Sequence, residues 1–258
     1  MSEFKSWLSY NDFEKKTRNT NRYIFDPDVQ GFLDSVLATS KKRHRKVREG
    51  TIFWRSQLGH IWKPVFHENE HVADEPYPFP PERMKPRPKK AIEGRANPKG
   101  IPSLYLATNK ETAMAEARPW LGAYLSVGQF KTNRDITIVD CTVMHRKDYV
   151  LYEEEPTVKE KEDSVWFHID KAFSNPVTPN DSDAGYIPTQ IIAESFKNNG
   201  TDGVFYESNL EKGHNLVLFD IGIADLINCF LFQTEKIKFS FRESYEQYFL
   251  RNKKIKNT

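Results

Sequence analysis

Clustered prolines between residues 74 and 102 are the feature that most limits how this chain folds. The segment begins DEPYPFPPERMKPRPKK and ends NPKGIP. Proline lacks a backbone N–H and has a fixed φ, so it interrupts helices and the hydrogen-bonded ladders of sheets. We therefore expect an extended loop here, with regular elements before and after it.

Short stretches of β-branched and aromatic residues on both sides of this loop predict strands. Helices are predicted where apolar residues recur at helical spacing: one starts with Asp26 as the cap and Pro27 in the first turn, and another starts at Pro188. The strands are expected at 51–55, 103–107, 125–130, 135–141, 203–207 and 215–219. Interspersed strands and helices predict an α+β fold.

A third helix is predicted directly after the strand 103–107. Thr108 and Glu111 have the spacing of a capping box, and Pro119 ends the helix. Within it, Glu116 shares a face with the small residues Ala113 and Ala117. This places a carboxylate on the inward face of the helix.

Length and charge set broad limits on function. The chain has 258 residues and a formal net charge of +2, so neither a nucleic-acid nor a membrane partner is indicated by overall charge. The N-terminus lacks a basic and apolar secretory signal, and the apolar stretch 216–232 contains Asp220 and Asp225. We expect a cytoplasmic protein with no membrane-spanning segment.

Three regions are less informative. The basic run KKRHRKVR at 41–48 favours a solvated helix end over a phosphate contact. Residues 145–185 look like an insertion with one helical piece. The C-terminal tail from residue 237 is predicted to pack as a strand or helix and then fray.

Several common catalytic motifs are missing. His67 and His71 are four residues apart, but prolines follow at once and no HExxH order is present, so no metal is expected. GxSxG, GxGxxG and Walker sequences are also absent, which argues against a serine hydrolase, an ordinary Rossmann fold and a P-loop. The remaining candidates are polar residues at the ends of elements: Arg55, Arg95, Tyr105, Glu116, Ser208 and Asn215.

The motifs around these residues resemble the RES domain family, named for its Arg, Glu and Ser. The resemblance rests on FWR, on GRANPKGIPSLYLATNKETAMAEAR and on GVFYESNLEKGHNLVLFD, and it covers about residues 51–220. It implies an ADP-ribosyltransferase-like core of two small packed sheets with surrounding helices. We expect an N-terminal helical extension at 1–50 and a catalytic domain at 51–258.

The resemblance also implies a function. RES proteins are the toxin half of bacterial toxin–antitoxin pairs and consume NAD, which here makes NAD the substrate, inorganic phosphate a candidate acceptor and an Xre-type antitoxin a candidate partner. A homo-oligomer is left open. The implied catalytic residues are Glu116, Arg95 and Tyr105, and the implied NAD-binding residues are Arg55, Arg95, Tyr105, Ser208 and Asn215.

The chemistry of these residue types suits NAD cleavage. Guanidinium groups such as those of Arg55 and Arg95 grip phosphates bidentately. Cleavage of the bond between nicotinamide and ribose passes through an oxocarbenium-like state, which the carboxylate of Glu116 stabilises electrostatically. The leading hypothesis is an NAD glycohydrolase or NAD phosphorylase. Two alternatives stay open: an ADP-ribosyltransferase acting on a protein or nucleic acid, and a nucleic-acid or partner-binding module that uses 41–48 and 85–90 beside a degenerate pocket.

Overall fold

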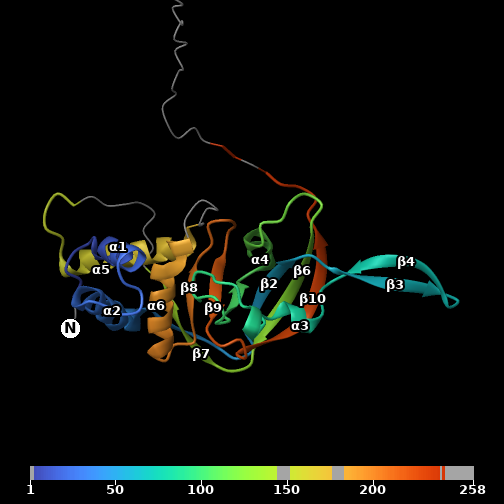
Figure 1. The fold of residues 1–258 in the computed structure, drawn as a ribbon, viewed down its shortest axis with the longest axis horizontal. Coiled ribbons are helices and arrows are strands. Elements are labelled where there is room, and N and C mark those ends of the chain that lie inside the picture. The colour runs from blue at the N-terminus through green and yellow to red at the C-terminus, as the bar shows by residue number, and fades with distance from the viewer. Residues whose placement is uncertain (1–2, 144–151, 176–182, 239, 242–258) are drawn as a thin grey trace, which may run out of the picture.

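A computed structural model describes residues 3–143, 152–175, 183–238 and 240–241 (Figure 1). The helices are α1 (Ser9–Asn19), α2 (Pro27–Ser40), α3 (Pro81–Met84), α4 (Lys110–Glu116), α5 (Val158–Ser174) and α6 (Ile187–Asn198), with 3-10 turns η1 (Lys41–Arg43), η2 (Pro88–Lys90) and η3 (Asp183–Tyr186). The strands are β1 (His44–Val47), β2 (Ile52–Leu58), β3 (Ile61–His67), β4 (Glu70–Tyr77), β5 (Leu104–Ala107), β6 (Tyr124–Thr132), β7 (Ile136–Asp140), β8 (Gly203–Glu207), β9 (His214–Leu218) and β10 (Ala224–Gln233). Interspersed helices and strands confirm the α+β class.

Eight strands form one mixed sheet in the order β1-β7-β8-β9-β5-β2-β6-β10. The pair β7–β8 is parallel, and the other neighbouring pairs are antiparallel. The connection between the middle strands β5 and β2 is minimal, because the two strands pair at one position, Trp54 with Ala107. The predicted two small sheets are therefore joined at a single residue pair into one sheet.

Helices α1, α2, α5 and α6 gather at one end of the molecule, whereas α3 and α4 lie beside strands of the sheet (Figure 1). Helix α6 lies between the sheet and the group α1, α2 and α5. Apolar side chains of these helices, among them Phe13, Phe32 and Trp166, form one hydrophobic cluster with the strand residues Val139 and Val204. The N-terminal helices α1 and α2 thus share a core with the rest of the chain. The domain boundary at residue 50 stays a prediction.

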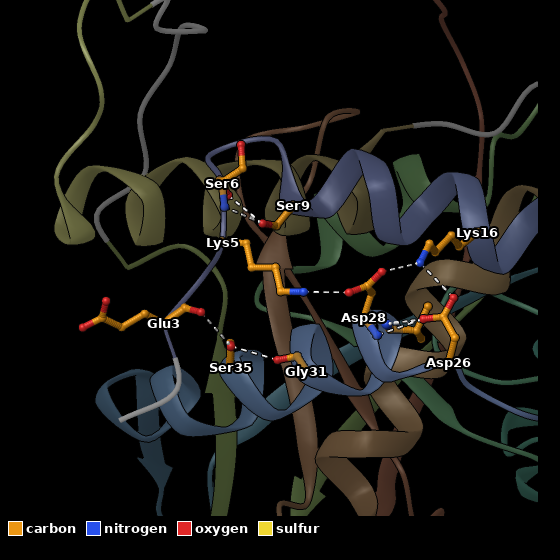
Figure 2. A network of polar contacts seen from close by, with 10 residues as sticks. Glu3, Lys5, Ser6, Ser9, Lys16, Asp26, Asp28, Gly31 and Ser35 are labelled. Atoms are coloured by element: carbon orange, nitrogen blue, oxygen red, sulfur yellow. Dashed lines mark hydrogen bonds and ion pairs between the residues drawn. The ribbon is translucent and has the colours of Figure 1, made fainter.

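A polar network ties the first residues to α2 (Figure 2). Asp26 caps α2 as expected, accepting hydrogen bonds from the backbone of Asp28 and Val29. The ammonium of Lys5 lies 2.6 Å from the Asp28 carboxylate, and Lys16 contacts both Asp26 and Asp28. The hydrogen bonds from the two lysines lower the pKa of Asp28 to about 2, so the network is formed throughout the neutral range.

The basic run is only in part the predicted solvated helix end: Lys41 and Lys42 are exposed directly after α2, but the run then continues as a strand. His44–Val47 form β1, an edge strand paired with β7. The side chain of Arg43 is buried, and its guanidinium lies 4.3 Å from the ring centroid of Trp166 and donates to the carbonyl of Val143. Three of the four residues of β1 are polar and exposed, so the strand has no alternating apolar pattern by which it could be predicted.

The proline-rich segment is more regular than predicted. Residues 70–77 form β4, which pairs with β3 in a separate two-stranded hairpin that extends from the end of the molecule opposite the helices (Figure 1). Pro76 is tolerated because the hairpin's strands have no further neighbours in the sheet. The segment after it contains only α3 and η2, as its prolines require.

The predicted insertion contributes a core element. Its helical piece is α5, capped by Thr157 and Glu160 in a reciprocal capping box. Its inner face, which includes Val165, Ile169 and Phe173, is fully buried. The predicted packing of the tail beyond residue 241 lies outside the described residues. Among the described residues, every helix is too short or too polar to span a bilayer.

Candidate active site

The point where β5 and β2 meet carries an in-register row of four residues from four neighbouring strands. Trp54 pairs with Ala107, Ala107 pairs with Asn215, and Asn215 pairs with Tyr206. Paired residues on neighbouring strands project to the same face of a sheet. All four residues line a cavity of about 310 Å³, so this row forms one wall of a concave site.

Glu116 lies at the last position of α4 and lines the same cavity. Its Oε1 atom accepts two hydrogen bonds, from Ser208 Oγ at 2.8 Å and from Asn215 Nδ2 at 2.7 Å. Ser208 and Asn215 are buried, whereas Glu116 is exposed at the cavity rim. The prediction of an inward carboxylate is therefore corrected: the helix face does line the cavity, but the carboxylate is open to solvent and held through one oxygen.

The position of α4 is fixed by the loop that carries Ser208. The helix is capped by Asn109, which accepts from the backbone of Thr112, and not by the predicted Thr108. The side chains of Asn109 and Thr112 also donate to the carbonyl of Lys212. These contacts connect the start of the helix with the β8–β9 loop, so Glu116 and Ser208 are held by one local network.

Arg55 spans the gap between the two halves of the sheet. It lies on β2, and its Nη1 atom donates to the backbone carbonyl of Tyr105 on β5 at 3.0 Å. Its Nε atom is buried and has no hydrogen-bond partner among the described residues. Burial lowers the pKa of Arg55 to about 10, which still leaves the guanidinium charged at neutral pH. A half-buried cation with a buried, unpartnered N–H and no carboxylate partner among the described residues is typical of an anion site.

Arg95 lies in a loop that several side chains hold in place. Its Nη1 atom donates to the carbonyl of Phe173 in the last turn of α5. Asn97 donates to three carbonyls of the same loop, and the amide of Gln190 on α6 donates to the carbonyls of Gly94 and Asn97. A helix of the predicted insertion thus anchors a predicted site residue.

Tyr105 supports this loop through its hydroxyl. The hydroxyl donates to Asn97 Oδ1 at 2.7 Å and accepts from the backbone N–H of Ala96 at 3.0 Å. Burial raises the pKa of Tyr105 above its ordinary value, so the hydroxyl stays protonated. These contacts indicate that Tyr105 positions the Arg95 loop. The residue also lines the cavity.

Gly94 has no room for a side chain, and we predict that Gly94→Ala is destabilising. An added Cβ would lie 2.5 Å from the Tyr105 hydroxyl oxygen and 3.1 Å from Asn97 Oδ1. Overpacking of this kind costs about 1–3 kcal/mol of unfolding free energy. Urea unfolding measures the loss.

Two further variants make this test specific. Gly31→Ala is the matched control, because no atom lies within 4 Å of its added Cβ and alanine is preferred within a helix by about 0.5–1 kcal/mol. Tyr105→Phe removes the clashing oxygen, so Gly94→Ala should cost less in that background than in the wild type. Equal costs in the two backgrounds would contradict the assigned contact.

The cavity brings five of the six predicted site residues together. Arg55, Arg95, Tyr105, Glu116 and Asn215 line it, and Ser208 reaches it through Glu116. Three aromatic residues that the sequence did not single out also line it: Trp54, Tyr186 and Tyr206. Trp54 and Tyr206 each lie within two residues of a predicted site residue. This proximity is the sequence signal that could have identified them.

Other concave regions have a different character. A cavity of about 700 Å³ lies among the N-terminal helices and is lined by residues 3–35, distant in sequence from all six candidates. In the described part of the chain, no group of three or more His, Cys, Asp or Glu residues is arranged to hold a metal ion. The charged groups of the candidate site are instead a carboxylate and two arginines.

Comparison with known proteins assigns the sequence to a family. The family model of the RES domain matches residues 61–239. A search of curated proteins finds no match. Among solved structures, one chain of the "M.tuberculosis MbcT-MbcA toxin-antitoxin complex" is similar, with a TM-score of 0.42 and 14% sequence identity over 79% of this chain and 94% of that chain. Because the family model covers more than half of the sequence, the chain belongs to the RES domain family.

Proposed function

We propose that this protein cleaves the bond between nicotinamide and ribose in NAD and transfers the ADP-ribosyl group to water or phosphate. The observation that carries the proposal is the Glu116 carboxylate, held by Ser208 and Asn215 at the rim of a cavity that also contains Arg55 and Arg95. A fixed carboxylate and two guanidinium groups match the two charge requirements of this substrate, a developing positive charge on ribose and a pyrophosphate.

Glu116 acts on the reacting ribose. As the C1′–N bond breaks, its electron pair moves to the pyridinium nitrogen and nicotinamide leaves as a neutral molecule. The ribose then has oxocarbenium character, which an adjacent carboxylate stabilises. An oxygen of water or phosphate bonds to C1′, and the attacking group loses its proton where it carries one. Since both described hydrogen bonds go to Oε1, Oε2 is the oxygen assigned to the substrate.

Arg55 and Arg95 bind the phosphates. Both are charged, and Arg55 has a buried nitrogen without a hydrogen-bond partner among the described residues. The aromatic rings of Trp54, Tyr186 and Tyr206 in the cavity wall offer surfaces against which the nicotinamide ring can stack. Stacking and phosphate binding together orient the scissile bond toward Glu116.

The biological role follows from the family resemblance and is part of the proposal. An enzyme that depletes NAD inhibits growth, which suits the toxin of a toxin–antitoxin pair. The proposed partner is an Xre-type antitoxin that covers the cavity, and the protein itself acts in the cytoplasm. Self-association remains a further proposal that an oligomeric-state measurement tests.

Product identification tests the proposal and separates its variants. NAD labelled in the adenine ring is incubated with the protein, with and without inorganic phosphate, and the products are separated by chromatography. Free ADP-ribose identifies a glycohydrolase, and a phosphorylated ADP-ribose formed only with phosphate identifies a phosphorylase. Label that stays with a protein or nucleic acid from an added lysate identifies a transferase. Intact NAD under all conditions would contradict the proposal.

A further inference from the structure

A second cavity adjoins the candidate active site on the side of the proline-rich segment. Its volume is about 550 Å³, and three residues, Arg55, Gly94 and Tyr105, line both cavities. The remainder of its wall comes from residues 83, 85–87, 90–93, 97 and 102–103, together with Gln57. The two cavities thus meet at Arg55, as the two halves of a dinucleotide meet at its pyrophosphate.

The second cavity is strongly basic. Its lining carries five basic side chains and one acidic side chain, Glu93; the basic ones are Arg55, Arg83, Lys85, Arg87 and Lys90. Two of the five are already engaged, because Lys85 pairs with Asp225 at 3.1 Å and Arg83 stacks over the ring of Phe79. For Arg87 and Lys90, no ion pair is found among the described residues.

The backbone presents Arg87 and Lys90 in a defined way. Pro86 and Pro88 restrict the chain on either side of Arg87, and η2 turns it so that the Lys90 N–H donates to the Arg87 carbonyl. The following residues are tied to the Arg95 loop, since Gly100 donates to the carbonyl of Ala91. The two basic side chains are therefore carried by a segment whose backbone is held by hydrogen bonds within it and to the Arg95 loop.

The charge in this cavity exceeds what NAD requires. The pyrophosphate of NAD is matched by Arg55 at the junction and by Arg95 in the catalytic cavity, and the adenosine half of NAD is otherwise uncharged. Arg87 and Lys90 add two cations beyond the pyrophosphate position. Arg87 and Lys90 form no ion pair among the described residues, and a phosphate on the adenosine ribose would be a suitable anionic partner. Guanidinium and ammonium groups bind phosphate by charge-assisted hydrogen bonds.

We propose that the second cavity binds the adenosine half of the substrate and that Arg87 and Lys90 select a dinucleotide with a third phosphate on the adenosine ribose, as in NADP. This inference rests on the proposed function for the identity of the reaction. It adds a substrate preference and assigns it to residues outside the catalytic cavity.

Binding of two adenosine phosphates tests the inference without turnover. The probes are 5′-AMP and adenosine 2′,5′-bisphosphate, which differ by the ribose phosphate alone, and calorimetry with the wild-type protein gives their affinities. We expect the bisphosphate to bind at least about tenfold more tightly, the size of one charge-assisted contact. The variant Arg87→Gln/Lys90→Gln should remove this difference and leave the affinity for 5′-AMP nearly unchanged.

A charge-matched control excludes a general electrostatic effect. Lys46→Gln/Lys131→Gln removes the same two charges from exposed strand positions that line neither cavity, and it should retain the tenfold difference. Equal affinities for the two probes in the wild type, or equal losses in both double variants, would overturn the inference.

Turnover separates this inference from the proposed function. We expect wild-type kcat/KM to favour NADP over NAD by at least about tenfold, and the Arg87→Gln/Lys90→Gln variant to lose this preference through a higher KM for NADP. Cleavage of NAD with no preference for NADP would refute the inference and retain the proposed function. Tight, Arg87- and Lys90-dependent bisphosphate binding without cleavage of either dinucleotide would refute the proposed function and retain the site.

Discussion

Replacing Glu116 with glutamine is expected to reduce nicotinamide release about 10²–10³-fold, the usual consequence of removing one electrostatic contact to a transition state. The substitution removes the negative charge that stabilises the oxocarbenium-like ribose. It keeps an amide oxygen that accepts hydrogen bonds from Ser208 and Asn215, the two partners of Oε1. Stability should therefore change little while turnover is lost.

The matched control is Glu111→Gln on the same helix. Glu111 lies in the first turn of α4, is exposed and lines neither the catalytic nor the basic cavity. Its variant loses the same charge and should keep wild-type turnover. Urea unfolding confirms that both variants are folded. A folded Glu116→Gln protein with more than a tenth of wild-type activity would remove Glu116 from its assigned role.

Replacing Trp166 with alanine is expected to lower the unfolding free energy by about 3–5 kcal/mol, the range for deletion of a fully buried tryptophan. Trp166 lies on α5 and is 1% exposed. Its indole N–H donates to Thr39 Oγ1 at 3.0 Å, its ring carries the Arg43 guanidinium, and it stacks on Phe196. The side chain thus connects α2 and η1 with α5 and α6. Its removal leaves a cavity and leaves the buried Arg43 guanidinium without its aromatic partner.

Two comparisons make the Trp166 result interpretable. Trp166→Phe keeps most of the volume and loses the hydrogen bond to Thr39, so it should cost less than the alanine variant. Trp120→Ala removes a tryptophan that is 65% exposed and should change the unfolding free energy by only about 0.5 kcal/mol, as is usual on a surface. A loss at Trp166→Ala no larger than that at Trp120→Ala would contradict a shared core between the N-terminal helices and α5.

Local sequence patterns predicted the elements that depend on local interactions. The segments around Asp26, Pro188 and residues 203–207 carry caps, prolines or β-branched runs, and each forms the expected helix or strand. The strand β1 was missed because its residues His44–Val47 are mostly charged and take their conformation from pairing with β7, which lies far away in the sequence. The β3–β4 hairpin was missed for a different reason: its strands contain Pro64 and Pro76, which argue against strands in the sequence but are tolerated because the two strands pair only with each other.

The sequence predicted those site residues that lie in a recognisable motif and have a residue type suited to the chemistry. Arg95, Tyr105 and Glu116 were found through their motif, and the hydrogen bonds of Glu116 connect it with Ser208 and Asn215 from nearly a hundred residues away. Trp54 and Tyr206 lie next to motif residues in the sequence, but their meeting in one cavity wall could not be predicted, because sheet register across four strands brings them together. The basic segment 85–90 was noted in the sequence as a candidate binding surface, but its place beside Arg55 depends on the fold and could not be predicted.

The most direct test of the central claim is the amount of nicotinamide released when the purified protein is mixed with an excess of dinucleotide, NAD and NADP in separate reactions. The account predicts repeated turnover, with one nicotinamide formed for each dinucleotide consumed and little release by Glu116→Gln. Wild-type protein that is folded, free of bound partner and supplied with phosphate, yet leaves both dinucleotides intact, would contradict it.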